Sequence, residues 1–195
     1  MARPREFDPD QALERCMGLF WARGFAGVSI SELEQATGLG RQSLYAAFGN
    51  KEALFAAVLE RYRAATEQWL APLFADDAGL ETVRGYVRGA LAAQGEHGAS
   101  GCLVVKTLWD RGLESGEFQA TARSAAKRVR AGLAHALERA QERGELSPGD
   151  SARRADLCFA ALNGLAALRR SGVSEASAVA SFELLLEGWK PVRGR

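Results

Sequence analysis

Three adjacent polar residues, Arg41, Gln42 and Ser43, carry side chains that suit the reading of DNA. Arginine forms paired hydrogen bonds with guanine, glutamine does so with adenine, and a serine hydroxyl bonds bases or phosphates. Tyr45 and Lys51 follow shortly after, and their hydroxyl and ammonium groups suit the same partners. We therefore predict that these five residues contact DNA, with Arg41 and Gln42 as the best candidates for reading bases.

Ser29, Arg3 and Arg5 join Lys51 as candidates for phosphate contacts. Ser29 and Lys51 each open a predicted helix, where free backbone N–H groups attract anions. Arg3 and Arg5 precede the first predicted helix, in an arm that could follow the DNA backbone or enter the minor groove. Exposed arginine, glutamine and lysine occur on most helices, so a purely structural helical bundle is the alternative for each position taken alone.

Cys102 is the residue best suited to thiol chemistry. Ser100 and Gly101 put it at a predicted helix start, where free N–H groups favour a thiolate. Lys106 follows one turn later, and its ammonium would favour the thiolate further. The predicted role is a sensor of oxidants or electrophiles. The alternative is a small buried residue at a helix start.

Catalysis is the rival reading of the same thiol. Cys102 would be the nucleophile and His97 its base. His97 has no obvious orienting carboxylate in its glycine-rich loop, and His135 has no metal-ligand partner at HExxH spacing. We therefore expect a protein that is not an enzyme and needs neither metal nor cofactor.

The DNA-reading residues require short helices to present them. Asp8 and Pro9 predict the start of a first helix that ends at Gly24. Ser29 and Glu32 form the Ser-x-x-Glu pattern of a capping box for a short second helix. A break at 37–40 then leads into a third helix over 41–48, so a helix-turn-helix is predicted at about 29–48.

The rest of the chain reads as further helices. Asn50 is expected to cap a long helix that runs towards Leu70 and ends at Pro72. Apolar residues at helical spacing and glycine breaks predict the remaining helices, which lie from Leu80 to about Leu91 and over 103–113, 118–143, 148–170 and 174–189. We predict an all-α fold of about nine helices in two parts, a DNA-binding domain over 1–62 and a larger helical domain over 63–195.

Composition narrows the class of protein. The net charge of +1 confines any DNA binding to a local surface. The three cysteines are few and widely spaced, which argues against a disulfide framework and against a paired-cysteine zinc site. No apolar run reaches the length of a membrane span, and the first residues lack a signal peptide's apolar stretch. We expect a cytoplasmic protein that does not enter membranes.

The run SLYAAFGNKEALF over 43–55, preceded by TGLGRQ over 37–42, resembles the DNA-binding region of TetR-family transcriptional regulators. The resemblance implies that Tyr45 and Lys51 clamp phosphates and that Leu44 and Phe48 hold the recognition helix. By the same resemblance, residues 41–43 face the operator and the helical domain over 63–195 binds an effector and forms the dimer. Many members carry histidine or another aromatic residue before the phenylalanine, where this chain has alanine, so the operator sequence does not carry over.

The Gly-Cys-Leu segment at 101–103 is similar to one found in a branch of the same family, some of whose members sense electrophiles. This similarity adds support for Cys102 as a sensor. A mostly apolar effector cavity is also expected, and the aromatic or histidine residues that could line it are Trp69, Phe74, Tyr86, His97, Trp109 and Phe118. Each of these residues is equally compatible with an ordinary core position.

The last two predicted helices carry more apolar surface than a helix pair hides. The residues concerned are Leu157, Ala161, Leu165, Leu168, Phe182, Leu185, Leu186 and Trp189. The family resemblance implies a homodimer through these helices, a palindromic operator, and repression relieved by a small molecule or a thiol-reactive signal. The alternatives are a single internal core, or an adaptor that binds other proteins and no DNA.

Overall fold

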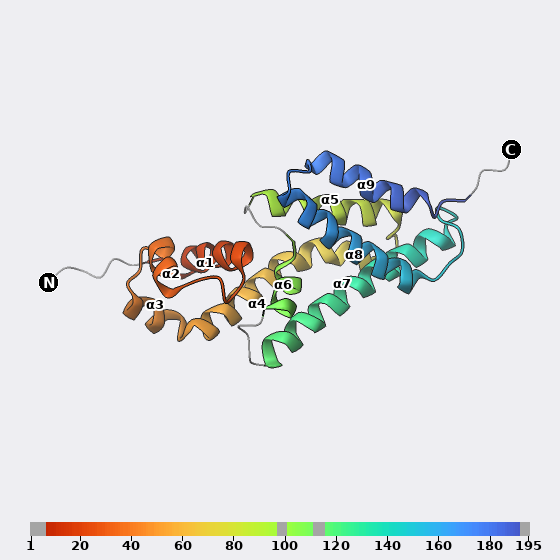
Figure 1. Cartoon of the computed structure of the whole chain (residues 1–195). Helices are drawn as coiled ribbons and strands as arrows, with labels where there is room; N and C mark the ends of the chain where they lie inside the picture. Colours follow the sequence, from red (N-terminus) through yellow and green to blue (C-terminus); the bar gives the residue numbers. More distant parts are fainter. Residues whose placement is uncertain (1–6, 97–100, 111–115, 192–195) are drawn as a thin grey trace.

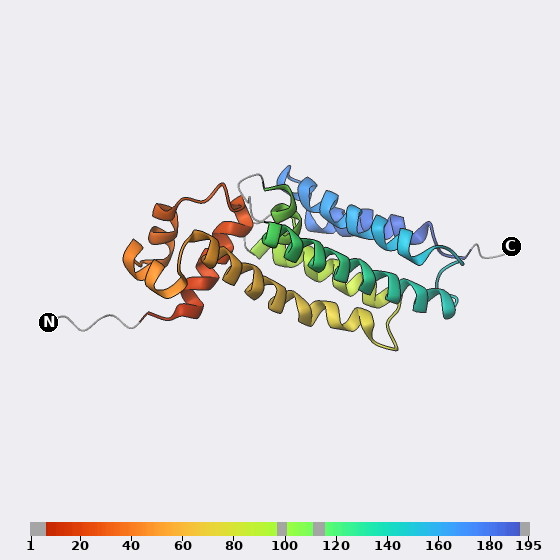
Figure 2. The ribbon, with the colours of Figure 1, turned by 90° about the horizontal axis from the view of Figure 1, so that it is seen from below.

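The computed structural model describes residues 7–96, 101–110 and 116–191 and is all-helical over that part of the chain. Figures 1 and 2 show helices α1 to α3 gathered at one end of an elongated molecule. Helix α4 runs from this end into a bundle that also contains α5, α7, α8 and α9. The predicted all-α fold in two parts is confirmed.

The helices of the smaller part begin at the predicted caps. The Asp8 carboxylate accepts from the N–H groups of Asp10 and Gln11 at the start of α1 (Pro9–Arg23). The capping box of Ser29 and Glu32 is complete in both directions at the start of α2 (Ile30–Thr37). Local sequence thus determines where these helices begin.

The turn between α2 and α3 (Arg41–Phe48) depends on a glycine. Gly38 ends α2 with a φ of 73°, a left-handed conformation that other residues adopt only at a cost. Its N–H donates to the carbonyl of Glu34. Together α2, the turn and α3 form the predicted helix-turn-helix.

Helix α4 (Lys51–Leu70) is a single continuous helix capped by Asn50, whose side chain accepts from the N–H of Ala53. A short 3₁₀ helix, η1 (Ala71–Phe74), follows and contains Pro72. The domain boundary predicted after residue 62 therefore falls inside a helix that belongs to both parts. The position of this boundary stays a prediction.

The larger part contains the five remaining helices. Their bounds are α5 (Leu80–Glu96), α6 (Leu103–Trp109), α7 (Gly116–Glu142), α8 (Ser151–Arg170) and α9 (Glu175–Glu187). The helix predicted over 103–113 is too long, because α6 ends at Trp109 and Asp110 caps it. Helix α7 begins two residues before the predicted Phe118, and α8 begins after Asp150 rather than at Pro148.

Two buried apolar clusters hold the fold together. The first joins α1 to α4, around Phe20 and Phe55, with Leu103 and Val104 of α6 and with two alanines of α7. The second fills the bundle of α5, α7, α8 and α9. Phe159 of α8 packs against both clusters. Residues of α6 and α7 in the first cluster, and Phe159 between the two clusters, therefore connect the end formed by α1 to α3 with the bundle.

None of the helices in the described residues is long and apolar enough to span a membrane.

Candidate DNA-binding and effector sites

Helix α3 presents its polar residues outward. Leu44 is fully buried and Phe48 packs against the first apolar cluster, as predicted for the residues that hold this helix. Arg41, Gln42 and Ser43 are exposed on the first turn. A helix held by two apolar residues with a polar first turn free in solvent has the form of a recognition helix.

Tyr45 and Arg41 lie side by side on α3. The Arg41 guanidinium carbon is 5.6 Å from the centre of the half-buried Tyr45 ring, a cation–π contact. The backbone N–H of Arg41 donates to the Glu34 carboxylate over 2.6 Å. Glu34 thus caps α3, whose N-cap residue Gly40 has no side chain for this role.

Lys51 has a structural partner that the sequence did not indicate. Its ammonium donates to the carbonyl of Phe25 over 2.7 Å and lies 4.2 Å from the centre of the Phe25 ring. Partial burial lowers the pKa of Lys51. An ammonium has three donors, so this bond fixes the turn between α1 and α2 and still leaves donors for a phosphate.

The hydroxyl of Ser29 is engaged in the capping box. It donates to the Glu32 carboxylate over 2.7 Å and accepts from the Glu32 N–H. The hydrogen bonds from Ser29, with the ion pair to Arg23, lower the pKa of Glu32 to about 2. The predicted contact of Ser29 with a DNA phosphate stays a prediction. Arg3 and Arg5 lie outside the described residues.

Cys102 is the N-cap residue of α6 and is half-buried. The Tyr62 hydroxyl donates to its sulfur over 3.4 Å. Burial, and secondarily the neighbouring thiol, raise the pKa of Tyr62. The other two cysteines, Cys16 and Cys158, are fully buried. His97, the base of the rival catalytic reading, lies outside the described residues.

Lys106 was predicted to support a thiolate at Cys102, but its ammonium has other partners. The Lys106 ammonium donates to the carbonyls of Trp21 and Ala22, over 2.5 and 2.8 Å. These carbonyls belong to the last turn of α1, where the helix dipole attracts a cation. Lys106 therefore binds α6 to the DNA-binding end.

Two more bonds join the same regions. The Trp21 indole N–H donates to the carbonyl of Gly101 over 2.7 Å, and the Asp110 carboxylate accepts from the N–H of Ala26 over 3.1 Å. We call the bonds made by Gly101, Lys106 and Asp110 the α1–α6 junction. They bind both ends of α6 to the end of α1 and to the turn that follows α1. A displacement of α6 would therefore move the end of α1 and this turn.

A cavity of about 450 Å³ lies between α1, α4, α5 and α8. Its volume is within the range of small-molecule sites. Most of its lining is apolar, and the residues are Glu14, Met17, Trp21, Arg61, Tyr62, Ala64, Ala65, Thr66, Gln68, Trp69, Tyr86, Gly89, Ala90, Ala93, Cys102, Phe159, Leu162 and Asn163. This cavity is the candidate effector site.

The predicted lining residues divide into two groups. Trp69 and Tyr86 line the cavity, but Phe74 and Phe118 do not. Phe74 packs near His135 instead, and Phe118 packs against Phe55. Trp109 is 82% exposed on a separate open groove between α6 and α8, to which Cys102 and Lys106 also contribute.

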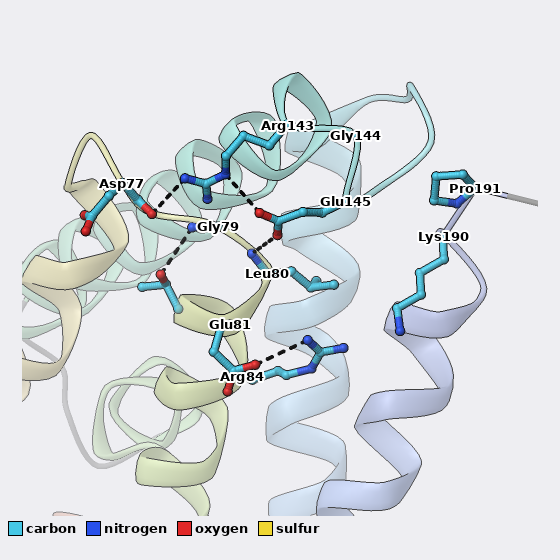
Figure 3. Close-up of a pocket in the computed structure, with 11 residues that line it drawn as sticks. Asp77, Gly79, Leu80, Glu81, Arg84, Arg143, Gly144, Glu145, Lys190 and Pro191 are labelled. Carbon is cyan, nitrogen blue, oxygen red and sulfur yellow. Dashed lines mark hydrogen bonds and ion pairs between the residues drawn. The ribbon is translucent and has the colours of Figure 1, made fainter.

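A polar cleft at the start of α5 is a weaker candidate (Figure 3). Its arginines are already engaged: Arg143 binds the carbonyl of Asp77 and the Glu145 carboxylate, and Arg84 binds Glu81 and Glu183. The same Glu145 also accepts from the N–H of Leu80 over 2.9 Å. Because these charges are paired within the protein, we interpret the cleft as a structural contact between α5 and the turn after α7.

Sequence reasoning missed the contribution of α1 to the cavity and the role of Asp110. Glu14, Met17 and Trp21 show ordinary helical spacing, which predicts one buried face but not what that face covers. The bond between Asp110 and Ala26 joins residues far apart in the chain, and no local pattern marks it.

Family comparisons match both parts of the chain. The family described as bacterial regulatory proteins, tetR family, matches residues 13–58. A tetracyclin repressor-like C-terminal domain matches residues 79–181. The HTH-type transcriptional repressor ComR of Escherichia coli K12 is 33% identical over 177 residues, which are 88% of this chain and 84% of ComR. The repressor NemR of the same strain is 34% identical over 123 residues, 62% of each chain.

Solved structures show the same likeness. A cysteine mutant of the TetR family regulator CifR, complexed with 26-bp operator DNA, aligns with a TM-score of 0.81 at 29% identity. The match covers 96% of this chain and all of that one. The reduced form of E. coli NemR aligns with a TM-score of 0.71 at 28% identity, over 91% of this chain and 96% of NemR.

Proposed function

Because the chain belongs to the TetR family of bacterial regulatory proteins, we propose that it represses transcription by binding operator DNA as a homodimer. We propose further that it leaves the operator when a signal reaches the larger domain. We expect the protein to act in the bacterial cytoplasm, because operator DNA is located there. The observation that carries the proposal is the exposed polar first turn of α3 on a helix anchored by Leu44, in a chain that resembles operator-bound CifR throughout.

In the proposed complex α3 enters the major groove. Arg41 and Gln42 read base edges, with Ser43 beside them, while Tyr45 and Lys51 hold phosphates. Ser29 lies at the start of α2, where backbone N–H groups add a phosphate contact. The cation–π contact with Tyr45 supports this arrangement, because it restrains the Arg41 side chain before DNA arrives.

The proposed dimer surface is the outer face of α8 and α9. Leu157 and Leu168 on α8 are 53% and 50% exposed, and Leu184 on α9 is 74% exposed. Small exposed residues lie between and beside them, namely Ala160, Gly164, Ala167, Ala176 and Ala180. Phe182 and Leu186, which were also expected on this surface, are buried in the chain's own core. A flat apolar face with small residues lets a second helix pair approach closely.

The proposed signal acts through the α1–α6 junction. Cys102 borders both the cavity and α6, so a ligand in the cavity or a modified thiol would displace the start of α6. Lys106 and Asp110 would carry that displacement to the end of α1 and to the turn before α2. A signal changes DNA affinity only if it favours the DNA-incompetent state.

Substitution of the base-reading residues tests the proposal. We expect Arg41→Ala and Gln42→Ala each to weaken operator binding by about 1–3 kcal/mol, the usual contribution of a bidentate base contact. Arg123→Ala, which removes an exposed arginine from α7, is the matched control and should leave affinity unchanged. Fluorescence anisotropy with labelled operator at fixed salt measures the effect. Equal affinities for all three variants would refute the assignment of α3.

A further inference from the structure

We propose that the cavity between α1, α4, α5 and α8 binds a neutral aromatic molecule, and that this ligand enters past the ring of Trp69. The proposal rests on the proposed function for its effect on DNA. Binding of the ligand itself does not require DNA.

The charges on the lining cancel. Glu14 and Arg61 are its two charged residues, and the Arg61 Nε lies 2.8 Å from the Glu14 carboxylate. Arg61 also reaches Asp10 over 3.2 Å, so its charge is already compensated. A ligand with a net charge would lose its hydration here and gain no free opposite charge. The lining therefore favours a neutral ligand.

The walls of the cavity are largely aromatic rings. Trp21 and Tyr62 meet edge to face, with ring centres 5.1 Å apart and planes at 81°. Tyr86, Trp69 and Phe159 add three more rings. Much of the remaining apolar lining is alanine or glycine, so ring faces and edges dominate the surface that a ligand meets. Aromatic ligands gain most from such surfaces, through offset stacking and edge-to-face contacts.

Two polar groups on the lining are available to a ligand. The Asn163 side-chain N–H donates to the carbonyl of Phe159 over 2.8 Å, so its side-chain oxygen can accept from a ligand. The Tyr86 hydroxyl makes no hydrogen bond to any residue in the described ranges, and burial raises the pKa of Tyr86, which keeps it a neutral donor. One or two hydrogen-bonding groups on an aromatic ring would match this pair.

Trp69 lies between the cavity and a groove on the surface. Its ring lies directly on α5, because a Cβ built at Gly89 would be 1.9 Å from Trp69 Cζ3. The side chain is 39% exposed, and together with Gln68 and Tyr86 it lines both the cavity and a surface groove between α4 and α5. A ligand that enters between α4 and α5 must move this ring.

The same ligand would touch the DNA-binding end directly. Met17 and Trp21 belong to α1, and the Trp21 indole also bonds Gly101 in the α1–α6 junction. A ring that packs against Trp21 would therefore act on α1 without an intermediate element.

A pair of dyes with one aromatic skeleton tests the ligand class. N-phenyl-1-naphthylamine is neutral, and 8-anilinonaphthalene-1-sulfonate adds an anionic group to the same rings. We expect the neutral dye to bind the full chain saturably, with energy transfer from tryptophan, and at least about tenfold more tightly than the sulfonate. Equal or tighter binding of the sulfonate would overturn the proposal.

Variants locate the site. Ala93→Phe fills the cavity and should abolish binding of the neutral dye, whereas Ala56→Phe adds the same ring to the separate groove between α4 and α7 and should not. Trp69→Ala provides a second readout that does not depend on Ala93→Phe folding, because it should speed association of the dye in stopped flow. Unchanged binding to Ala93→Phe, or an unchanged association rate in Trp69→Ala, would overturn the site or the entry route respectively.

Operator binding in the same samples separates the two proposals. If the neutral dye binds the cavity and the operator stays bound, the ligand site stands and the proposed release does not. If operator DNA binds normally and the neutral dye does not bind, the ligand class is wrong and the DNA-binding function stands.

Discussion

At the scale of single residues, the three thiols differ sharply in environment. Burial raises the pKa of Cys16 to about 11 and that of Cys158 to about 12, so neither forms a thiolate near neutral pH. Cys102 is half-buried at a helix start and borders two hollows. It is the thiol that reagents can reach.

We therefore predict one rapidly reacting thiol per native chain. A disulfide reagent such as Ellman's should label Cys102 quickly and the other two thiols only after unfolding, and Cys102→Ser should lose the rapid phase. Absorbance in stopped flow measures the phases. A rapid phase that persists in Cys102→Ser would contradict the prediction. A sensor role requires in addition that labelling lowers operator affinity.

Glu32 gives the helix-turn-helix a defined pH dependence. Its pKa falls from the ordinary 4.5 to about 2 in the folded chain, because Ser29 and Arg23 bond the carboxylate. The resulting stabilisation is present above the unfolded-state pKa and is lost as the pH falls through the folded-state value. The difference in unfolding free energy between wild type and Glu32→Gln should shrink between about pH 5 and about pH 2.

Urea unfolding at stepped pH measures this difference. Glu138→Gln, on the exposed face of α7, is the control for a glutamate outside any capping box. A difference between wild type and Glu32→Gln that stays constant down to about pH 2 would contradict the linkage.

At the scale of elements, the local signals were the most predictive. Asp8, Ser29 and Asn50 each cap the helix that the sequence assigned to them, because a cap depends on residues two or three positions away. Helix α6 was less predictable. Lys106 bonds the last turn of α1 and Asp110 bonds the turn after it, and both partners lie far from α6 in the sequence.

The candidate sites follow the same division. The outward residues of α3 could be predicted from the positions of Leu44 and Phe48 on one short helix. The cavity could be predicted only in kind, as mostly apolar, since helical spacing does not say which faces meet. Thus Trp69 and Tyr86 were correctly proposed as lining, whereas the α1 residues were not.

The α1–α6 junction gives a test at this scale. Lys106→Met keeps the length of the side chain but removes the bonds to the carbonyls of Trp21 and Ala22. We expect a loss of about 1–3 kcal/mol in unfolding free energy, as for other hydrogen bonds from charged groups. Lys127→Met, at an exposed position on α7, is the control. Equal stability of the two variants in urea would show that the bonds of Lys106 add nothing.

At the scale of the whole molecule, two parts with different chemistry are joined by α4 (Figure 1) and by the hydrogen bonds of the α1–α6 junction. One end presents polar side chains from α3, and the outer face of α8 and α9 presents apolar ones. Two-fold pairing through that face would set two copies of α3 on one side of a duplex.

The dimer surface is tested with a charge. Leu184→Glu places a carboxylate on the most exposed leucine of α9 and should convert a dimer to a monomer with little loss of monomer stability. Ala120→Glu introduces the same group at an exposed position on α7, outside this face, and should leave the dimer intact. Sedimentation velocity distinguishes the species. A wild-type monomer, or a Leu184→Glu dimer of unchanged affinity, would contradict the proposed surface.

The central claim is that this chain reads operator DNA through two symmetric copies of α3. Selection of the purified protein against randomised duplexes at fixed salt, followed by sequencing, tests it most directly. We predict enrichment of a palindrome whose half-sites lie about one helical turn apart, lost in Arg41→Ala. Failure to enrich any sequence, with the cysteines either reduced or oxidised, would contradict the claim and favour an adaptor that binds other proteins.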